Sequence, residues 1–149
     1  MKIKRMMFVL LALVAVSLVF ALTASAETVK GTGTITAQGS GMAIVRGDGE
    51  VVIHGHGGGS VYVKGADVLQ AVGIGMRSDL PGGGVLFLGW RGTIRVAGDD
   101  LAVWMMGKSV EFTATGTGWV YLQGRGTYTI NGEDGEWTAR GEHLPLAPQ

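Results

Sequence analysis

Cysteine is absent from the 149-residue chain, so its fold has neither disulfide bonds nor a thiol-linked lipid anchor. Helical periodicity is also absent: after residue 26 no stretch keeps an apolar period of 3.6 residues over three turns, and we expect essentially no helix. Serine is scarce and never stands in a G-x-S-x-G motif. A nucleophilic hydrolase therefore finds no support, and no catalytic residue is predicted.

The N-terminus has the three parts of a secretory signal peptide. A basic segment (positions 1–5) precedes an apolar run (positions 6–22), and Ala24 and Ala26 then form an A-x-A site. This order predicts a signal peptide over residues 1–26, with cleavage between Ala26 and Glu27, and a secreted or cell-envelope protein. The apolar run reaches the low end of what spans a bilayer, so an uncleaved membrane anchor is the alternative.

The remaining chain, residues 27–149, has the length of a single domain. Removing the three basic residues of the N-terminal segment leaves nine basic residues against twelve acidic ones, a net charge of −3. Neither a nucleic acid nor, after cleavage, a membrane is expected as a partner, because the chain has no basic surface for nucleic acid or anionic lipid.

All 27 glycines lie after residue 26, and many recur at every eighth position. One such series is Gly33, Gly41, Gly49, Gly57, Gly65 and Gly73. Between the glycines lie short runs typical of strands, such as TITAQ, MAIVR and EVVIH. Short strands separated by glycine-containing turns predict β-hairpins joined into a meander.

A longer repeat is superimposed on this spacing. Sliding the sequence without a gap lays positions 29–65 on positions 88–124, with eleven identities in 37 positions. The identities include Gly33 on Gly92 and the Val-Tyr pair at 61–62 on the pair at 120–121. We therefore predict two tandem β units, at about 29–87 and 88–146, within one all-β domain.

Pairing across hairpin turns at residues 40–41 and 48–49 predicts which side chains are buried. One face then carries only apolar residues in both copies: Ile35, Ala37, Met42, Ile44, Val51 and Ile53, with the counterparts Ile94, Val96, Leu101, Val103, Val110 and Phe112. The opposite face, which includes Val45, Trp104 and His54, is mixed. The predicted fold is an antiparallel β-sandwich or, alternatively, a barrel. A parallel β-solenoid with three eight-residue strands per coil is a third, less favoured interpretation.

His54 and His56 are the candidate metal ligands. Residues two apart in a strand point the same way, so this H-x-H pair could present two imidazoles to one ion. Their counterparts in the second copy are Thr113 and Thr115, so the fold does not require imidazole there. The candidates for a third ligand are distant in sequence: Asp48, Glu50, Asp67, Asp99 and His143. Solvent-exposed histidines near a turn are the favoured interpretation, and no cofactor is predicted.

Two further motifs are interpreted as turns. The acidic segment NGEDGE, residues 131–136, lacks the ligand spacing of a dedicated calcium loop and predicts a solvated hairpin turn. The G-x-G segments GHGGGS and GIGMRS are not followed by a helix, which a dinucleotide site requires.

The aromatic residues are more indicative of binding. All four tryptophans, Trp90, Trp104, Trp119 and Trp137, fall in the second predicted copy. Large flat side chains stack on sugars or on partner proteins, so Trp90, Trp104 and Trp119 are candidate ligand-binding residues. The favoured interpretation is nevertheless that they cover the sheet or fill gaps opposite glycines.

The glycine turns around short Val-rich strands, ending in GRGTYTINGEDGEW at residues 124–137, resemble a group of exported, glycine-rich all-β proteins with no assigned activity. The resemblance implies no site residues. The sequence thus predicts an exported, non-enzymatic scaffold or binding protein, whose partner could be an extracellular glycan, a cell-surface component or a second copy of itself. A carbohydrate-binding module using the tryptophans and a metal-dependent protein using His54 and His56 are the alternatives.

Overall fold

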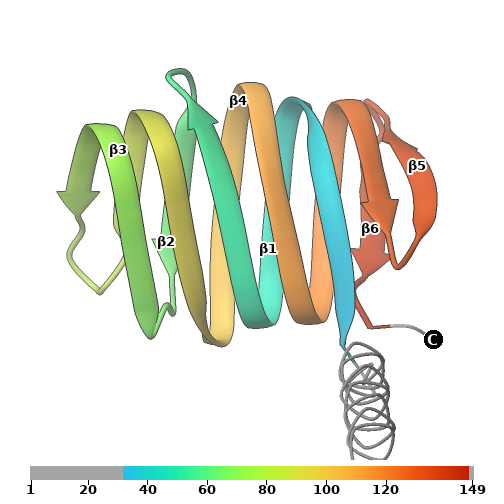
Figure 1. The fold of residues 1–149 in the computed structure, drawn as a ribbon, viewed down its shortest axis with the longest axis horizontal. Helices are drawn as coiled ribbons and strands as arrows, with labels where there is room; N and C mark the ends of the chain where they lie inside the picture. Colours follow the sequence, from blue (N-terminus) through green and yellow to red (C-terminus); the bar gives the residue numbers. More distant parts are fainter. Residues whose placement is uncertain (1–31, 148–149) are drawn as a thin grey trace, which may run out of the picture. The chain divides into compact units, whose positions relative to one another are not determined.

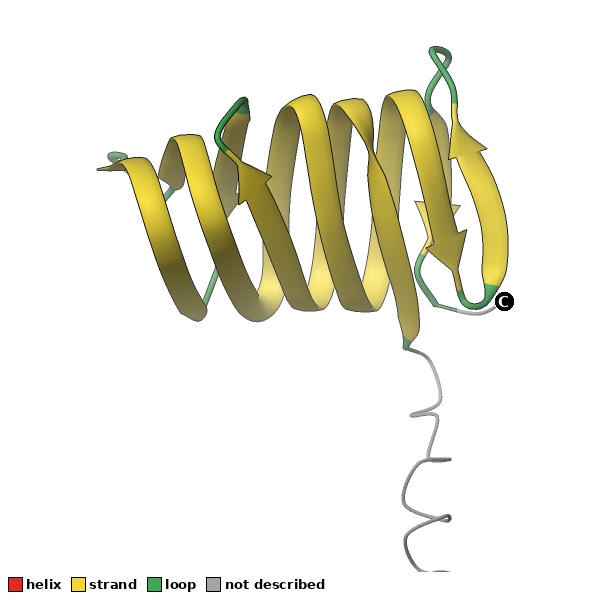
Figure 2. Ribbon diagram, turned by 45° about the horizontal axis from the view of Figure 1, so that its top comes forward, coloured by secondary structure: helices red, strands yellow, loops and turns green. Residues whose placement is uncertain are grey.

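A computed structural model describes residues 32–147, and all of their helix or strand structure is β-strand (Figure 2). This confirms the all-β prediction. The strands are β1 (Gly33–His56), β2 (Ser60–Lys64), β3 (Val68–Asp79), β4 (Val85–Ile130), β5 (Glu133–Trp137) and β6 (Glu142–Pro145). The predicted signal peptide and its cleavage site lie outside the described residues. Within residues 32–147 there is no helix that is long and apolar enough to cross a membrane.

The six strands form one sheet that winds into a coil (Figure 1). β1 runs antiparallel to β4 and pairs with it along both of its edges. Gly33 and Gly49 both pair with Gly116, so the chain completes one turn of the coil between these two glycines. The sheet does not close on itself, and the predicted two-sheet sandwich and closed barrel are not confirmed.

The predicted hairpin turns at residues 40–41 and 48–49 are wrong, because both lie inside the continuous strand β1. The spacing from Gly33 to Gly41 to Gly49 corresponds to half a turn of the coil at each step. At Gly41 and Gly49 φ is +135° and +147°, a region that side chains disfavour. A Cβ atom would also overlap the carbonyl oxygen of Gln123 or Thr115 on the neighbouring strand. Glycine at these positions therefore lets two closely spaced strands bend together.

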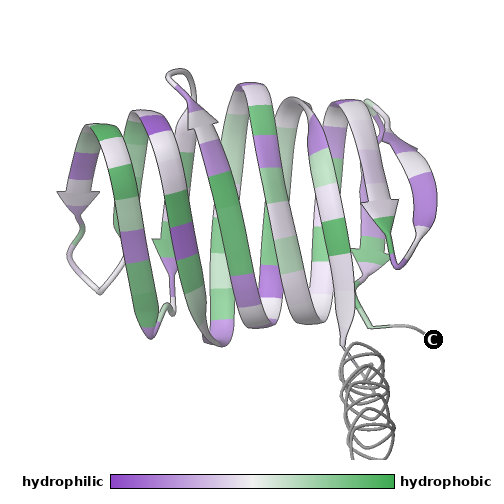
Figure 3. Ribbon diagram, viewed as in Figure 1, coloured by the Kyte–Doolittle hydropathy of each residue, from purple (hydrophilic) through white to green (hydrophobic). Residues whose placement is uncertain are grey.

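Side chains along β1 alternate without interruption, and its odd-numbered residues face the inside of the coil. Figure 3 shows the resulting bands of apolar and polar residues along the strands. Ala43 and Val45 are buried, whereas Met42 and Ile44 are only partly covered on the outside. The prediction had these two pairs reversed, because a two-residue turn at 40–41 would have changed the face. The remaining predicted core positions are buried: Ile35, Ala37, Val51, Ile53, Ile94, Val96, Leu101, Val103, Val110 and Phe112.

Where β4 pairs with β1, two bulges in β4 change which of its side chains face the inside of the coil, whereas β1 has no bulge. Gly47 pairs with Leu101 and Gly49 with Gly98, so two steps along β1 match three along β4. The same mismatch lies between Val110 and Gly107. The ungapped superposition of the two predicted copies therefore equates residues of opposite orientation in this region, for example the buried Val45 and the outward Trp104. The duplication itself stays a prediction.

The two ends of the coil differ. At one end β5 and β6 both pair with β4, and Trp137 and Leu146 are buried with exposed fractions of 4% and 2% (Figure 1). At the other end lies β3, which pairs only with β4. The core is thus covered at the C-terminal end, while β3 leaves one sheet edge without a partner strand among the described residues.

Candidate functional site

The outside of the coil has two chemically different sides. The first, here called the threonine side, carries mainly hydroxyl and charged groups: Thr34, Thr36, Glu50, His54, Arg95, Glu111, Thr113, Thr115, Thr127 and Thr129. The second, here called the aromatic side, carries large apolar groups: Met42, Ile44, Tyr62, Trp104, Met106, Trp119 and Tyr121. Half a turn separates the two sides, so the period of the coil sorts residues eight positions apart onto opposite surfaces.

A row of large side chains crosses the aromatic side. Tyr62 lies opposite Trp104, Trp104 opposite Ile44, Ile44 opposite Tyr121, and Tyr121 opposite His143. The rings of Tyr62 and Trp104 are 5.3 Å apart and inclined by 42°. Directly opposed side chains on one face of a sheet contact each other, which explains why residues from four strands meet here.

A hollow of about 500 Å³ lies beside this row, and Trp104 forms part of its wall. Lys64 and Arg46 flank Ala102 on the two neighbouring strands, and all three line the hollow. The short side chain of Ala102 between these long ones gives the hollow a floor that is only 4% exposed. Asp100 also lines it, with its main-chain N–H donating to Asp48 Oδ1 at 2.8 Å.

Neither Arg46 nor Lys64 forms a salt bridge with another residue in 32–147. Both side chains are exposed. The hollow therefore combines an aromatic ring with two cationic hydrogen-bond donors and one carboxylate, all from different positions in the sequence.

The other tryptophans are engaged within the fold. Trp90 packs edge-on against the core residue Phe87, with ring centroids 5.1 Å apart. Trp119 lies against the ring of His143 at 4.4 Å, and Trp137 is buried. The indole N–H groups of Trp90 and Trp137 are buried and have no hydrogen-bond partner among residues 32–147. Trp90 and Trp104 are both partly exposed and both line a hollow, but the hollow beside Trp90 holds only about 20 Å³, whereas the one beside Trp104 holds about 500 Å³.

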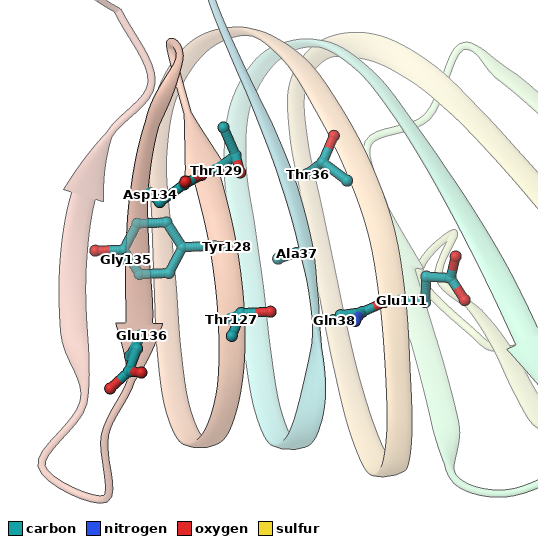
Figure 4. Close-up of a pocket in the computed structure, with 10 residues that line it drawn as sticks. All are labelled: Thr36, Ala37, Gln38, Glu111, Thr127, Tyr128, Thr129, Asp134, Gly135 and Glu136. Atoms are coloured by element: carbon teal, nitrogen blue, oxygen red, sulfur yellow. Dashed lines mark hydrogen bonds between the residues drawn. The ribbon is translucent and has the colours of Figure 1, made fainter.

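The threonine side holds an open trough of about 530 Å³ near the C-terminal end of the coil (Figure 4). Hydroxyl, amide and carboxylate groups line it, among them Thr36, Gln38, Glu111, Thr127, Thr129, Asp134 and Glu136. Several are already paired: Thr36 and Thr113 hydroxyls lie 3.2 Å apart, and Thr129 donates to Asp134 at 2.6 Å. The hairpin turn predicted for residues 131–136 is shorter: Asn131 and Gly132 join β4 to β5, with Ile130 opposite Glu133, and residues 133–136 belong to β5.

Tyr128 also lines the trough, and its packing there changes a measurable quantity, the pKa of its phenol. Burial, together with the adjacent Glu142 carboxylate, raises the pKa of its phenol. The phenol donates a 3.2 Å hydrogen bond to Glu142 Oε2, which favours the protonated form. The folded state thus holds this proton more tightly than the unfolded chain, and the associated stability is lost as pH rises through the folded pKa.

We therefore expect Glu142→Gln to lower the pKa of Tyr128 while leaving it above the ordinary tyrosine value, because the burial remains. The phenolate absorbance, titrated in each protein and in its Tyr128→Phe derivative, isolates this residue from the other two tyrosines. An unchanged pKa in Glu142→Gln would contradict the role of the carboxylate.

His54 and His56 both face outward at the end of β1, as strand alternation predicts for His54. His56 Nε2 lies 2.8 Å from Glu111 Oε2, and the two side chains are 48% and 40% exposed. Glu111 was not among the predicted third ligands. Most of the residues that were predicted contact other residues and not His54 or His56. Glu50 pairs with Arg95, Asp48 and Asp67 accept hydrogen bonds from Asp100 and Asp99, and His143 stacks on Trp119.

Among residues 32–147 no group of three or more histidine, aspartate or glutamate side chains is arranged to hold a metal ion. The metal site at His54 and His56 stays a prediction. His56 forms an exposed pair with Glu111, which contributes at most about 1 kcal/mol to stability, and His54 is exposed.

Comparison with known protein families, curated proteins and solved structures finds no match to this chain. The functional assignment therefore depends on the geometry of its own residues.

Sequence patterns alone did not single out the residues that accompany Trp104. Arg46, Lys64 and Ala102 lie on three strand segments that become neighbours only through the winding of the coil. A signal was present in the sequence: the hairpin register already placed Trp104 outward. The positions beside it could not be identified without the pairing of β2 with β4.

Proposed function

We propose that this protein is a non-enzymatic carbohydrate-binding protein that acts outside the cytoplasm and uses the aromatic side of the coil. The single observation that carries the proposal is the placement of Trp104 in the wall of a hollow that also holds Arg46, Lys64 and Asp100. Export, which the N-terminal sequence predicts, would bring this surface to extracellular or cell-envelope glycans.

The chemistry of the hollow matches that of a sugar ring. A pyranose has an apolar C–H face that stacks on an aromatic ring, and a rim of hydroxyl groups that both donate and accept hydrogen bonds. Trp104 supplies the platform, Arg46 and Lys64 supply donors, and Asp100 supplies an acceptor. Tyr62, beside Trp104, extends the platform along the row, so a chain of sugars would have more than one contact.

The rigidity of the sheet favours binding of a ligand to this surface. Trp104 is held between two hydrogen-bonded strands, opposite Tyr62 on one side and Ile44 on the other. A platform that is already positioned loses little conformational freedom when a ligand binds.

Titration with soluble polysaccharides tests the proposal. The probes are a β-glucan, chitin oligosaccharides and polygalacturonate, and the readouts are tryptophan fluorescence and isothermal titration calorimetry. At least one probe is expected to bind, and Trp104→Ala should weaken that binding tenfold or more, since an aromatic platform contributes about 1.4 kcal/mol or above.

Trp90→Phe is the matched control, because this ring packs against Phe87 and does not line the hollow. It should bind the same probe with unchanged affinity. Binding that is lost equally in Trp90→Phe, or the absence of binding to all three probes, would count against a carbohydrate site at Trp104 and favour a structural scaffold.

A further inference from the structure

The open end of the coil concentrates exposed apolar side chains. Of the seven large hydrophobic residues that are exposed in 32–147, five lie between Val68 and Leu80, on β3 and the residue after it. The most exposed are Val72 at 75%, Ile74 at 74% and Met76 at 58%. From Val68 to Met76 the strand has no charged residue and no proline. This part of β3 therefore lacks the charges and the proline that normally keep the edge of a sheet from pairing. The charged residues of β3, Arg77 and Asp79, follow it and form an ion pair with each other at 3.4 Å.

The backbone of this edge is also available. β3 pairs with β4 along one side, and no strand of the described residues pairs with its other side. The irregularity between Ile74 and Met76 places its extra residue on β4, where two steps along β3 match three, from Arg91 to Leu88. The free edge of β3 therefore continues without a bulge.

Glycine pairing within the coil shows how another strand would fit. At two bends of β1, glycine lies opposite glycine on both sides: Gly41 pairs with Gly107 and Gly124, and Gly49 with Gly98 and Gly116. On the edge of β3 that pairs with β4, Gly73 lies opposite Gly92. A strand added to the free edge of β3 should obey the same rule, because it must follow the same bend without a Cβ atom at the contact.

β3 itself satisfies this rule. We propose that two copies of this chain associate end to end through an antiparallel β3–β3 pairing in which Ile74 faces Ile74 of the second copy. In this register Gly73 lies opposite Gly75 on both sides of the two-fold axis. The interface is isologous, so each contact occurs twice.

The same register also matches the exposed side chains. On the face that carries Ile74, Val72 lies opposite Met76, Val68 opposite Leu80, and the polar residues Gln70 and Ser78 lie opposite each other. On the other face, Arg77 lies opposite Ala71 and Asp79 opposite Leu69. All five exposed apolar side chains of this segment thereby find apolar partners, although the register was chosen from the glycines alone. Moving the two-fold axis by two residues to Val72, which shifts every pairing by four residues, would put Gly73 and Gly75 opposite Ala71 and Leu69, so the bends of the two copies would not coincide.

Sedimentation velocity of the purified protein over a range of concentrations tests the association. The expected result is a species with the mass of two chains. Ile74→Lys should reduce it to the mass of one chain, because two ammonium groups would face each other on the axis. Met106→Lys is the control: Met106 is 55% exposed but lies inside the sheet, between Met42 and Ser60, and this variant should remain a dimer.

Cysteine cross-linking tests the register, since the chain has no cysteine of its own. Ile74→Cys should form a disulfide-linked dimer on mild oxidation. Val72→Cys should cross-link only when mixed with Met76→Cys. A wild-type mass of one chain at every concentration would overturn the association, and faster cross-linking of Val72→Cys with itself would overturn the register. Neither result bears on carbohydrate binding, which uses the aromatic side.

Discussion

Gly49→Ala is expected to lower the free energy of unfolding by at least about 3 kcal/mol, a large part of the roughly 5–15 kcal/mol that stabilises an ordinary domain. Two causes add up at this position. The backbone has φ of +147°, where any side chain is strained. The new Cβ atom would also overlap the carbonyl oxygen of Thr115 and lie 2.8 Å from the Cα of Gly116. Because β1 is paired with a segment of β4 on both sides of Gly49, neither neighbouring segment can move away without breaking the sheet.

Urea unfolding followed by far-ultraviolet circular dichroism measures this loss. Gly58→Ala is the matched control, because Gly58 lies in the loop between β1 and β2 and a Cβ atom there meets nothing within 4 Å. We expect the control to be neutral or slightly more stable, since alanine reduces the freedom of the unfolded chain. Equal effects of the two substitutions would show that Gly49 does not lie at a tight bend between paired strands.

The strand content was predictable because β-branched residues and period-two alternation act locally. The way in which the strands connect was not. A glycine at every eighth position is compatible with a two-residue hairpin turn, where positive φ is needed, and equally with a bend inside a long strand, where space is needed. Only the partner strands decide between them: at Gly41 the obstacle to a side chain is Gln123, which is 82 positions away.

This ambiguity had a limited effect on the predicted core. Each predicted two-residue turn that is in fact continuous strand reverses the predicted orientation of the side chains that follow it. After two such turns the predicted orientation is correct again. Val51 and Ile53 were thus placed correctly, whereas Ala43 and Val45, which lie after one turn, were not. Trp104 was placed on the outside correctly, because the bulge in β4 supplies the change of face that β1 lacks.

The candidate site was predictable only in part for the same reason. An outward tryptophan can be inferred from alternation within its own strand. Its partners in the hollow, Lys64 and Arg46, come from segments 40 and 58 positions before it, and their placement depends on the length of chain in one turn of the coil. The eight-residue glycine spacing contains half of that length, but only the pairing of the strands shows that two such spacings make one turn.

The bulge between Gly98 and Leu101 decides which of two adjacent methionines is buried, and therefore which one stabilises the fold. Without the bulge, the alternation that buries Ile94 and Val96 would also bury Met106 and expose Met105. With it, Met105 is 1% exposed and Met106 is 55% exposed. We expect Met105→Ala to cost about 2–5 kcal/mol, because it removes buried contacts and leaves a cavity.

Met106→Ala is the matched control for Met105→Ala, and it should change stability by no more than about 0.5 kcal/mol, as is usual for exposed positions. The two substitutions are chemically identical and neighbouring, so differences in strand propensity cancel, and denaturant midpoints can be compared directly. If Met106→Ala proved the more damaging, β4 would have no bulge here and Trp104 would face the core. The platform on which the carbohydrate proposal depends would then be absent from the surface, so this one comparison of two methionines tests the fold and the candidate site together.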